Sequence, residues 1–226
     1  MSEAVKEIPP YVEKYYWWAY ARPWATRLFE RQWLINLILL GNYIKLRDAT
    51  LEEFRYMSGN TLQISCCYGN LTPLIAERIL QSGGTLDVID VLPVQLENLQ
   101  RKMPPRESVR LFNMDSTALR MQDARYDRVL VFFLMHEQPQ KYREKTLHEA
   151  LRVLKPGGTI VIVDYSKPST WNPVRYLVLP ILGILEPFAI ALWNKELAEI
   201  LPEMSGSAWK KTSYFGGLFQ KLVTVK

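Results

Sequence analysis

Apolar residues in this chain gather in short runs that alternate with segments of helical periodicity. Five runs rich in β-branched and aromatic residues predict strands, at residues 61–64, 85–90, 109–115, 126–135 and 159–164. Three intervening segments predict helices: one with Thr72 as N-cap and Pro73 as first residue, and two at 93–102 and 140–154. This alternation indicates an α/β fold with a parallel sheet. Two final runs, 209–215 and 218–225, flank a glycine pair and predict an antiparallel hairpin.

The first 60 residues carry an aromatic and basic pattern instead. Residues 11–20 read YVEKYYWWAY, and Trp24, Leu28 and Ile35 share one stripe at helical spacing, with arginines beside them. Trp and Tyr are favoured at the membrane–water boundary because the ring can sit in hydrocarbon while its polar edge stays wet. We therefore expect residues 1–60 to form a membrane-facing or substrate-facing arm. A lid helix that packs its aromatic side chains on the core is the alternative.

A second apolar segment, residues 172–193, reads NPVRYLVLPILGILEPFAIALW. Its length approaches that of a membrane span, which needs about 20 apolar residues. Arg175 and Glu186 carry charge, however, and two prolines and a glycine interrupt a straight helix. We expect an interfacial or substrate-covering element. A buried helical cover is the alternative, and a true span is the least favoured reading.

Length and composition fit one α/β domain with additions. The chain has 226 residues, 48% of them hydrophobic, which is too short for two full domains. The net charge of +5 suits several anionic partners, and no dense Lys/Arg run chooses among them. Cys66 and Cys67 are adjacent, so neither a disulfide framework nor a C-x-x-C metal site is expected, which favours a reduced, cytoplasmic setting. Residues 1–10 lack an apolar run of signal-peptide type.

The stretch 61–70, TLQISCCYGN, carries the main candidate chemistry. An apolar strand ends there in small residues and Gly69 just before a helix, which aims backbone N–H groups and the helix dipole at a ligand. Asp90 ends the next strand about 20 residues later, where nucleotide sites place a carboxylate for the ribose hydroxyls. The pattern indicates a nucleotide-type cofactor site. An ordinary buried strand and turn is the alternative.

This motif resembles the cofactor-binding region of class I S-adenosylmethionine-dependent methyltransferases. Where that family has an acid and then alternating glycines, this chain has Gln63, Ser65 and Cys67, and only Gly69 remains. The phrase LRVLKPGGTIVIVD at 151–164 is highly typical of the same family. The resemblance implies a Rossmann-like α/β fold, with a mostly parallel seven-stranded sheet and an antiparallel C-terminal hairpin. The expected organisation is the helical arm, residues 1–60, followed by a methyltransferase-like domain, residues 61–226.

The same resemblance implies which residues contact the cofactor. Asp115, at the end of the third predicted strand, matches an acid that faces the adenine amino group. On local grounds it could equally cap a helix that begins at Ser116. The residues implied to bind S-adenosylmethionine are Gln63, Ser65, Cys67, Tyr68, Gly69, Asp90, Val91, Asp115 and Ser116.

Three phrases together carry a closer resemblance: FERQWLINLILLGNY at 29–43, QISCCYGNLT at 63–72 and FFLMHEQP at 132–139. They resemble the rhodoquinone biosynthesis enzymes of the RquA type, relatives of the ubiquinone and menaquinone C-methyltransferases. The resemblance implies conversion of ubiquinone to rhodoquinone, in which an amino group replaces a ring methoxy group. It also implies S-adenosylmethionine as the amino donor and a divalent metal, expected to be Mn²⁺.

The resemblance further implies site residues and a setting. The strand 126–135 would deliver His136 and Glu137 to the carboxyl edge of the sheet, where open α/β folds bind ligands. The implied catalytic residues are His136, Gln63 and Tyr16, and the implied metal ligands are His136, Glu137 and Asp115. The implied partners are ubiquinone and the membrane surface, without nucleic acid. The implied location is the cytoplasmic face of the inner membrane, or the mitochondrial inner membrane in a eukaryote, with peripheral attachment.

Gln63 is the departure with the clearest chemical consequence. A nearby carboxylate favours the protonated form of the cofactor's amino group, whereas an amine must lose its proton before it attacks a quinone. An unperturbed α-amino group has a pKa of roughly 7.7–8.0, so a modest downward shift would leave much of it neutral. We hypothesise that Gln63 removes the charge that would hold the amine protonated.

Two other functions fit the same residues. A conventional quinone or lipid methyltransferase would release S-adenosylhomocysteine in proportion to product, whereas amination would not. A catalytically inactive module that binds quinone or membrane is favoured by the lost glycines and disfavoured by Asp90 and Asp115. No N-P-P-Y motif follows the fourth predicted strand, which disfavours a nucleic-acid methyltransferase.

Overall fold

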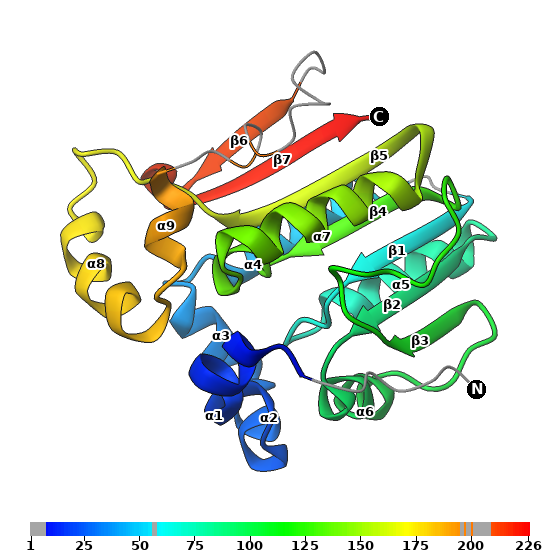
Figure 1. The fold of residues 1–226 in the computed structure, drawn as a ribbon, viewed down its shortest axis with the longest axis horizontal. Coiled ribbons are helices and arrows are strands. Elements are labelled where there is room, and N and C mark those ends of the chain that lie inside the picture. Colours follow the sequence, from blue (N-terminus) through cyan, green and yellow to red (C-terminus); the bar gives the residue numbers. More distant parts are fainter. Residues whose placement is uncertain (1–7, 56–57, 195–196, 198–199, 201–208) are drawn as a thin grey trace. The chain divides into compact units, whose positions relative to one another are not determined.

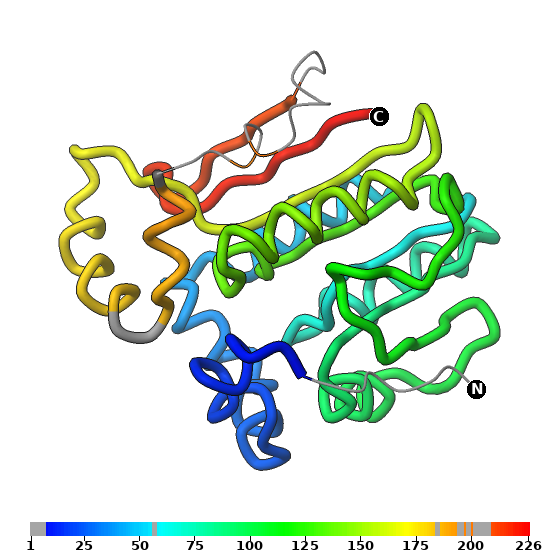
Figure 2. The backbone as a smooth tube through the Cα atoms, in the orientation of Figure 1, coloured from blue at the N-terminus to red at the C-terminus, as the bar shows by residue number. Residues whose placement is uncertain are grey.

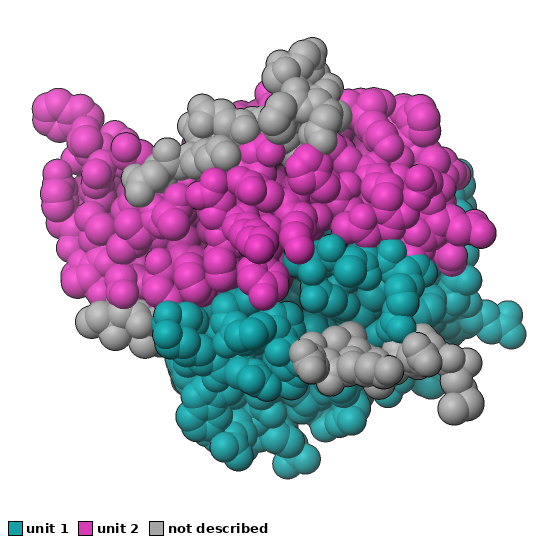
Figure 3. Space-filling view, viewed as in Figure 1, with its two compact units in different colours: residues 1–120 teal, residues 121–226 magenta. Residues whose placement is uncertain are grey.

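The computed structural model describes residues 8–55, 58–194, 197, 200 and 209–226. The helices and strands are labelled in Figure 1. The chain divides into two compact units, residues 1–120 and residues 121–226 (Figure 3). The described residues contain seven strands, three in unit 1 and four in unit 2. Both units combine strands with helices, as the predicted α/β alternation requires.

Unit 1 is a helical region followed by three parallel strands (Figure 2, blue to green). Its helical region consists of η1 (Val12–Tyr16), α1 (Trp17–Tyr20), α2 (Pro23–Phe29), α3 (Gln32–Ile38) and α4 (Tyr43–Glu52). The rest consists of β1 (Asn60–Ile64), α5 (Leu71–Gln81), β2 (Thr85–Asp90), α6 (Pro93–Lys102) and β3 (Val109–Asn113). The strands pair in the order β3-β2-β1. Because they are parallel, their carboxyl ends lie at one edge.

The arm is helical, but the prediction that Trp24, Leu28 and Ile35 form one continuous apolar stripe is wrong. α2 ends at Phe29, and Arg31 has extended backbone (ψ 117°) before α3 begins. Trp24 and Ile35 therefore lie on different helices, with exposed fractions of 62% and 8%. Local spacing alone could not reveal this break.

Two sequence-predicted bounds in unit 1 are wrong, whereas β2 and α6 match their predictions. α5 begins at Leu71 with Asn70 as its N-cap residue, so Thr72 and Pro73 lie inside the first turn. β3 ends at Asn113, and Asp115 follows in a turn. α6 begins at its predicted proline because that residue suits the first helical position.

Unit 2 consists of β4 (Tyr126–Phe132), η2 (Met135–Glu137), α7 (Gln140–Val153), β5 (Leu154–Tyr165), α8 (Val174–Leu185), α9 (Ala189–Asn194), β6 (Lys210–Tyr214), η5 (Phe215–Gly217) and β7 (Phe219–Val225). β4 and β5 are parallel, and β7 pairs antiparallel with both β5 and β6. The predicted C-terminal hairpin is thereby confirmed. Val129, Leu130 and Val131 are all fully buried, which requires that both faces of β4 are covered.

Several bounds in unit 2 differ from the sequence prediction. β4 ends at Phe132 because Phe133 adopts φ +52°, which turns the chain into η2 instead of extending the strand to residue 135. α7 ends at Val153, and β5 starts at Leu154 and continues through the predicted glycine turn. The apolar segment 172–193 forms α8 and α9 on either side of Glu186. Across the described ranges, the structure contains no helix long and apolar enough to cross a membrane.

A candidate cofactor loop and a buried histidine

The cofactor loop, residues 65–70, follows β1 and contains two residues with positive φ. Ser65 has φ +73° and Gly69 has φ +83°. The left-handed region suits glycine and strains other residues by roughly 1–2 kcal/mol. Ser65 N–H donates to Ile89 O at 2.9 Å, which fixes the residue in that conformation. Ser65 thus keeps a backbone shape that glycine would adopt more easily.

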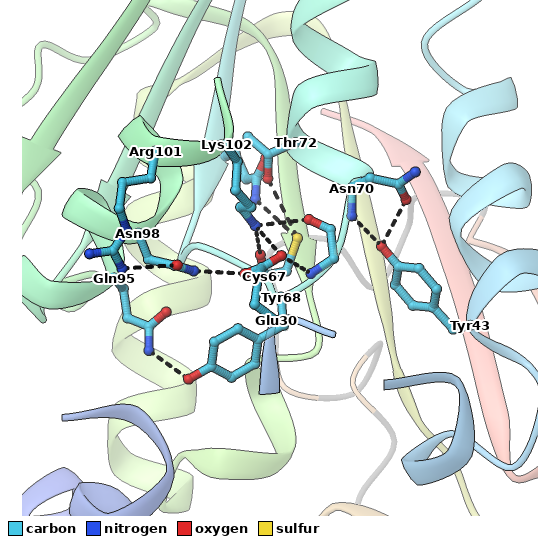
Figure 4. Close-up of polar contacts among 12 residues, drawn as sticks. Glu30, Tyr43, Cys67, Tyr68, Asn70, Thr72, Gln95, Asn98, Arg101 and Lys102 are labelled. Carbon is cyan, nitrogen blue, oxygen red and sulfur yellow. Dashed lines mark hydrogen bonds and ion pairs between the residues drawn. The ribbon is translucent and has the colours of Figure 1, made fainter. Parts of the chain in front are cut away.

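Gly69 is also required by its neighbour Tyr43 from α4. A Cβ atom at residue 69 would overlap the Tyr43 hydroxyl. That hydroxyl accepts from Asn70 N–H at 2.8 Å and donates to Asn70 Oδ1 at 3.3 Å (Figure 4). Tyr43 therefore serves the start of α5, where a Thr72 cap was predicted. Thr72 Oγ1 lies instead 3.5 Å from Cys67 Sγ.

Asp90, at the end of β2, is buried and accepts hydrogen bonds from the first two residues of the loop. Its Oδ2 accepts from Cys66 N–H at 2.8 Å and from Ser65 Oγ at 3.2 Å, and its Oδ1 accepts from Leu92 N–H at 2.9 Å. Burial raises the pKa of Asp90 to about 6, although these hydrogen bonds oppose the shift. The carboxylate is thus mostly ionised at neutral pH. Its predicted contact with the ribose stays a prediction.

Gln63 is fully buried in β1 and has one unsatisfied atom. Its Nε2 donates to Ser65 O at 3.0 Å and lies 3.6 Å from Cys67 Sγ. Its Oε1 is buried and has no hydrogen-bond partner among the residues that the structure describes. A buried acceptor without a hydrogen bond destabilises the folded protein by roughly 1–3 kcal/mol, so a hydrogen-bond donor on a ligand would bind favourably at this position. The amino group of S-adenosylmethionine is such a donor, and the residues present therefore fit that cofactor.

The two cysteines of the loop are not charged nucleophiles. Burial raises the pKa of both thiols; Asp90 adds to the shift at Cys66, and Lys102 opposes it at Cys67. Both thiols are therefore protonated at neutral pH, and a thiol is a far weaker nucleophile than a thiolate. Neither is in a disulfide, and the predicted contact of Cys67 with the cofactor stays a prediction.

Three residues predicted to bind the cofactor, Val91, Asp115 and Ser116, lie just after β2 and β3. Asp115 Oδ1 accepts from Thr117 N–H at 2.8 Å and from Thr117 Oγ1 at 2.9 Å. The local alternative is thus partly right, since Asp115 caps a turn, but no helix follows. Val91 O accepts from Asn113 Nδ2 at 3.0 Å. The cofactor contacts assigned to Asp115, Ser116 and Val91 stay predictions.

The loop has further partners that sequence reasoning missed: Glu30, Tyr43, Gln95 and Lys102 (Figure 4). Glu30 is 39 residues from Gly69 along the chain, and Lys102 is 33 residues from it. The sequence contains no periodicity or motif that links positions so far apart.

His136 lies in η2 of unit 2, and its ring is held by Asp164 from β5. His136 Nδ1 is 2.9 Å from Asp164 Oδ1. Asp164 is fully buried and also accepts from the backbone N–H of Met135 and of Tyr165, each at 2.7 Å. These bonds fix the carboxylate and thereby the orientation of the imidazole.

The other ring nitrogen of His136 faces two more carboxylates. Its Nε2 is 3.9 Å from Glu137 Oε1 and 4.0 Å from Glu186 Oε2. Burial lowers the pKa of His136, but Asp164, Glu186 and Glu137 outweigh it and raise the pKa to about 9. Glu186 was not predicted as a site residue. It is the only acid of the segment 172–193, which is the one sequence signal that could have singled it out.

The predicted metal ligands come from both units. His136 and Glu137 are neighbours in unit 2, whereas Asp115 belongs to unit 1 and binds Thr117. Among the described residues, no set of three or more His, Cys, Asp and Glu side chains could hold a metal ion. The assignment of these three residues as metal ligands stays a prediction. Tyr16, predicted as catalytic, is buried in η1, and its role stays a prediction.

Residues 61–158 match the family model described as a methyltransferase domain. Over 204 residues the chain is 26% identical to the uncharacterized methyltransferase sll0829 of Synechocystis sp., covering 90% of this chain and 92% of the relative. It is 28% identical to the ubiquinone/menaquinone biosynthesis C-methyltransferase UbiE of Azotobacter vinelandii, covering 67% of this chain and 63% of the relative. It is 29% identical to a demethylmenaquinone methyltransferase of Staphylococcus saprophyticus, covering 66% of this chain and 66% of the relative.

A solved S-adenosylmethionine-dependent methyltransferase from Aquifex aeolicus superposes with a TM-score of 0.60 at 18% identity, covering 90% of this chain and 97% of that one. The chain has the class I S-adenosylmethionine-dependent methyltransferase fold. The predicted fold class is thereby confirmed: the strands are mostly parallel, the C-terminal pair is antiparallel, and an aromatic helical region precedes them. The matched domain begins at residue 61, within β1, and contains the cofactor loop.

Proposed function

We propose that this chain is an S-adenosylmethionine-dependent transferase that acts on a quinone ring. The fold supports the cofactor, and the names of the menaquinone and ubiquinone relatives support the substrate class. The observation that carries the proposal is Gln63 Oε1, a buried acceptor with no partner next to the cofactor loop of that fold. It marks the place where a ligand donor would bind.

Each cofactor role falls to a residue of unit 1. When bound, S-adenosylmethionine supplies an activated methyl group and a primary amine. Gln63 Oε1 accepts a hydrogen bond from that amine. Asp90 accepts from the ribose hydroxyls with a carboxylate that its protein donors hold in place. Asp115 and Ser116 contact the adenine.

His136 is the proposed acid for the quinone. Because its pKa is raised to about 9, its ring carries a proton at neutral pH. A protonated imidazole donates to a quinone carbonyl oxygen, which withdraws electrons from the ring and favours attack on it. Asp164 holds the ring in one orientation during this step.

The transferred group distinguishes two versions of this function. Methyl transfer is the version that the relatives' names favour, and it releases S-adenosylhomocysteine in proportion to product. The test is incubation of the purified chain with S-adenosylmethionine and a demethylated quinone, or with ubiquinone, followed by mass spectrometry. A methylated quinone with equal S-adenosylhomocysteine supports methyl transfer. A chain that binds cofactor but changes neither quinone supports the inactive-module alternative.

Amination of ubiquinone to rhodoquinone is the second candidate, and the charge of the loop favours it. Position 63 is an uncharged amide, and the Glu30 carboxylate is paired with Lys102 at 2.9 Å. A neutral amine would attack the ring carbon that bears a methoxy group, and methanol would leave with a proton of the amine. The bond between the nitrogen and the cofactor's α-carbon would then have to break, so that the amino group stays on the ring. In the same assay, amino-quinone without matching S-adenosylhomocysteine supports this version. Requirement for a divalent metal stays a prediction, and loss of product on chelation with recovery on adding Mn²⁺ tests it.

Peripheral membrane attachment, at the cytoplasmic face of an inner membrane, is part of the proposal. Large apolar side chains of the arm are exposed, namely Trp17, Trp18, Trp24, Leu28, Trp33, Leu37 and Ile38, and so are Trp171, Tyr176 and Leu177 in unit 2. Apolar burial combined with Arg side chains gives binding that salt only partly reverses. The chain should float with anionic liposomes and be released by detergent. No flotation at low salt would contradict this attachment.

A further inference from the structure

A polar cluster joins the N-terminal arm to the cofactor loop. Glu30, the C-cap residue of α2, accepts from Gly69 N–H at 2.9 Å and from Asn98 Nδ2 at 2.7 Å, and it pairs with Lys102 Nζ at 2.9 Å. Both charged side chains are mostly shielded, with exposed fractions of 20% and 15%. Shielding makes such a pair stronger than a surface ion pair.

Lys102 binds carbonyl groups of the same loop. Its ammonium donates to Gly69 O at 2.8 Å and to Cys67 O at 3.3 Å, besides its bond to Glu30 (Figure 4). An ammonium group has three N–H donors, and these three acceptors use all of them. Glu30 thus binds an amide N–H of the loop while Lys102 binds two carbonyl oxygens, and the two side chains bind each other.

Aromatic contacts connect the arm and the loop at a second point. Tyr68 stacks with Tyr20 at 5.6 Å between ring centroids and with Phe29 at 5.9 Å. Its hydroxyl donates to Ala19 O at 2.9 Å and accepts from Gln95 Nε2 at 2.9 Å. Movement of α1 and α2 away from the loop would therefore break contacts at both Tyr68 and Gly69.

We propose that Glu30 and Lys102 are positioning residues for the cofactor, forming a clamp that couples docking of the arm to the shape of the cofactor loop. The inference rests on the proposed function, because it takes the loop to bind S-adenosylmethionine. It adds that the arm is part of the cofactor site through two side chains that carry no group to the reaction. Since coupling is reciprocal, cofactor binding also holds the arm in place.

The first test measures cofactor binding by calorimetry in three variants. Glu30→Ala removes the acceptor and the charge, and should weaken binding of S-adenosylmethionine and S-adenosylhomocysteine roughly tenfold. Glu30→Gln keeps an oxygen for Gly69 N–H, and should fall between the parent and Glu30→Ala. Lys155→Met is the matched control, because it breaks an ion pair of similar length, 2.8 Å to Asp127, away from the loop; it should leave affinity unchanged.

A second readout separates positioning from a purely structural role. Trypsin can cut the arm after Arg27 and Arg31. S-adenosylhomocysteine should slow these cuts several-fold in the parent and in Lys155→Met, and much less in Glu30→Ala or Glu30→Gln. In turnover, the Glu30 variants should raise KM for the cofactor while kcat changes little. If Glu30→Ala does not fold, by circular dichroism, the comparison is made with Glu30→Gln.

Three results would overturn the clamp. Equal affinity in parent and Glu30 variants would show that the pair only stabilises the fold. Tighter binding in Glu30→Ala would show that Glu30 blocks the site. A parent chain that binds neither S-adenosylmethionine nor S-adenosylhomocysteine would overturn the proposed function and the clamp together, which distinguishes that failure from the first two.

Discussion

The cofactor loop and the turn that contains His136 differ in how the nearby carboxylates are paired. Beside the loop, each carboxylate has donors of its own: Asp90 accepts from two N–H groups and a hydroxyl, and Glu30 pairs with Lys102. Position 63, where the methyltransferase family has an acid, is an amide. Around His136, three carboxylates, those of Asp164, Glu137 and Glu186, lie within 4.0 Å of the ring nitrogens.

The difference shows how one fold can prepare two protonation states. Excess negative charge stabilises a cation, so His136 is held as imidazolium despite its burial. Gln63 carries no charge, so an amine bound beside it would lose its proton more easily than beside an acid. The following predictions test this contrast, beginning with the largest expected effect.

Asp164→Asn should have the largest effect on activity. The amide cannot stabilise the imidazolium and favours the wrong orientation of the ring, so turnover should fall on the order of 10²-fold or more. Asp127→Asn, which weakens the ion pair with Lys155, is the control and should change turnover little. Steady-state kinetics at neutral pH measures both. Parent-like kcat in Asp164→Asn would show that the dyad has no role in the reaction.

Stability should fall as pH rises past neutrality because of His136. The pKa of His136 is about 9 in the folded protein against about 6.5 when unfolded. Its contribution to the free energy of unfolding is therefore fully present below pH 6.5 and is lost as pH rises through 9. The size is on the order of 3 kcal/mol, from about 1.4 kcal/mol for each pKa unit. Urea unfolding at pH 6 and pH 9.5 measures it.

The chain's two histidines supply the control for that experiment. His136→Gln should flatten the pH dependence over this range, whereas His148→Gln, at an exposed position of α7, should keep the slope of the parent. A slope that survives in His136→Gln would assign the dependence to another group.

Asp90→Asn should have the next largest effect. If Asp90 accepts both ribose hydroxyls, the variant should weaken S-adenosylmethionine binding by on the order of 1.5–3 kcal/mol, the range for a charge-assisted hydrogen bond. In the parent, affinity should decline as pH falls through about 6, where Asp90 takes up a proton. Calorimetric titration at pH 5.5 and 7.5 checks both effects. Unchanged affinity in the variant would remove Asp90 from the cofactor site.

Local signals predicted most of the fold and only part of the candidate site. α6 was placed correctly because Pro93 starts it and a proline pair follows it, both of which act within a few residues. Thr72 failed as a cap because Tyr43, 27 residues before Asn70, serves that helix end. Likewise, Asp164 reaches His136 across 28 residues, and Glu30 reaches Gly69 across 39. Such pairs depend on tertiary packing, which residue spacing does not encode.

Gln63→Glu tests the charge of the loop directly and should have the smallest effect on binding. The new carboxylate gives the cofactor's ammonium group a partner, while loss of the donor to Ser65 O opposes this gain. Binding should therefore be intact or improved. Amination should nevertheless fall at neutral pH, because the carboxylate raises the amine pKa and reduces its neutral fraction.

The sign of the pH dependence separates this electrostatic effect from simple damage to the site. Raising the pH should restore part of the amination by Gln63→Glu, since the neutral fraction of the amine grows as pH approaches its raised pKa. Gln63→Met, which has similar length and no charge, should bind cofactor more weakly and show no such recovery, because it removes the acceptor without adding a carboxylate. Rates measured from about pH 6 to about pH 9, the range in which such an amine titrates, decide the matter. If Gln63→Glu binds cofactor normally and aminates at the parent rate throughout, position 63 does not control the protonation of the amine.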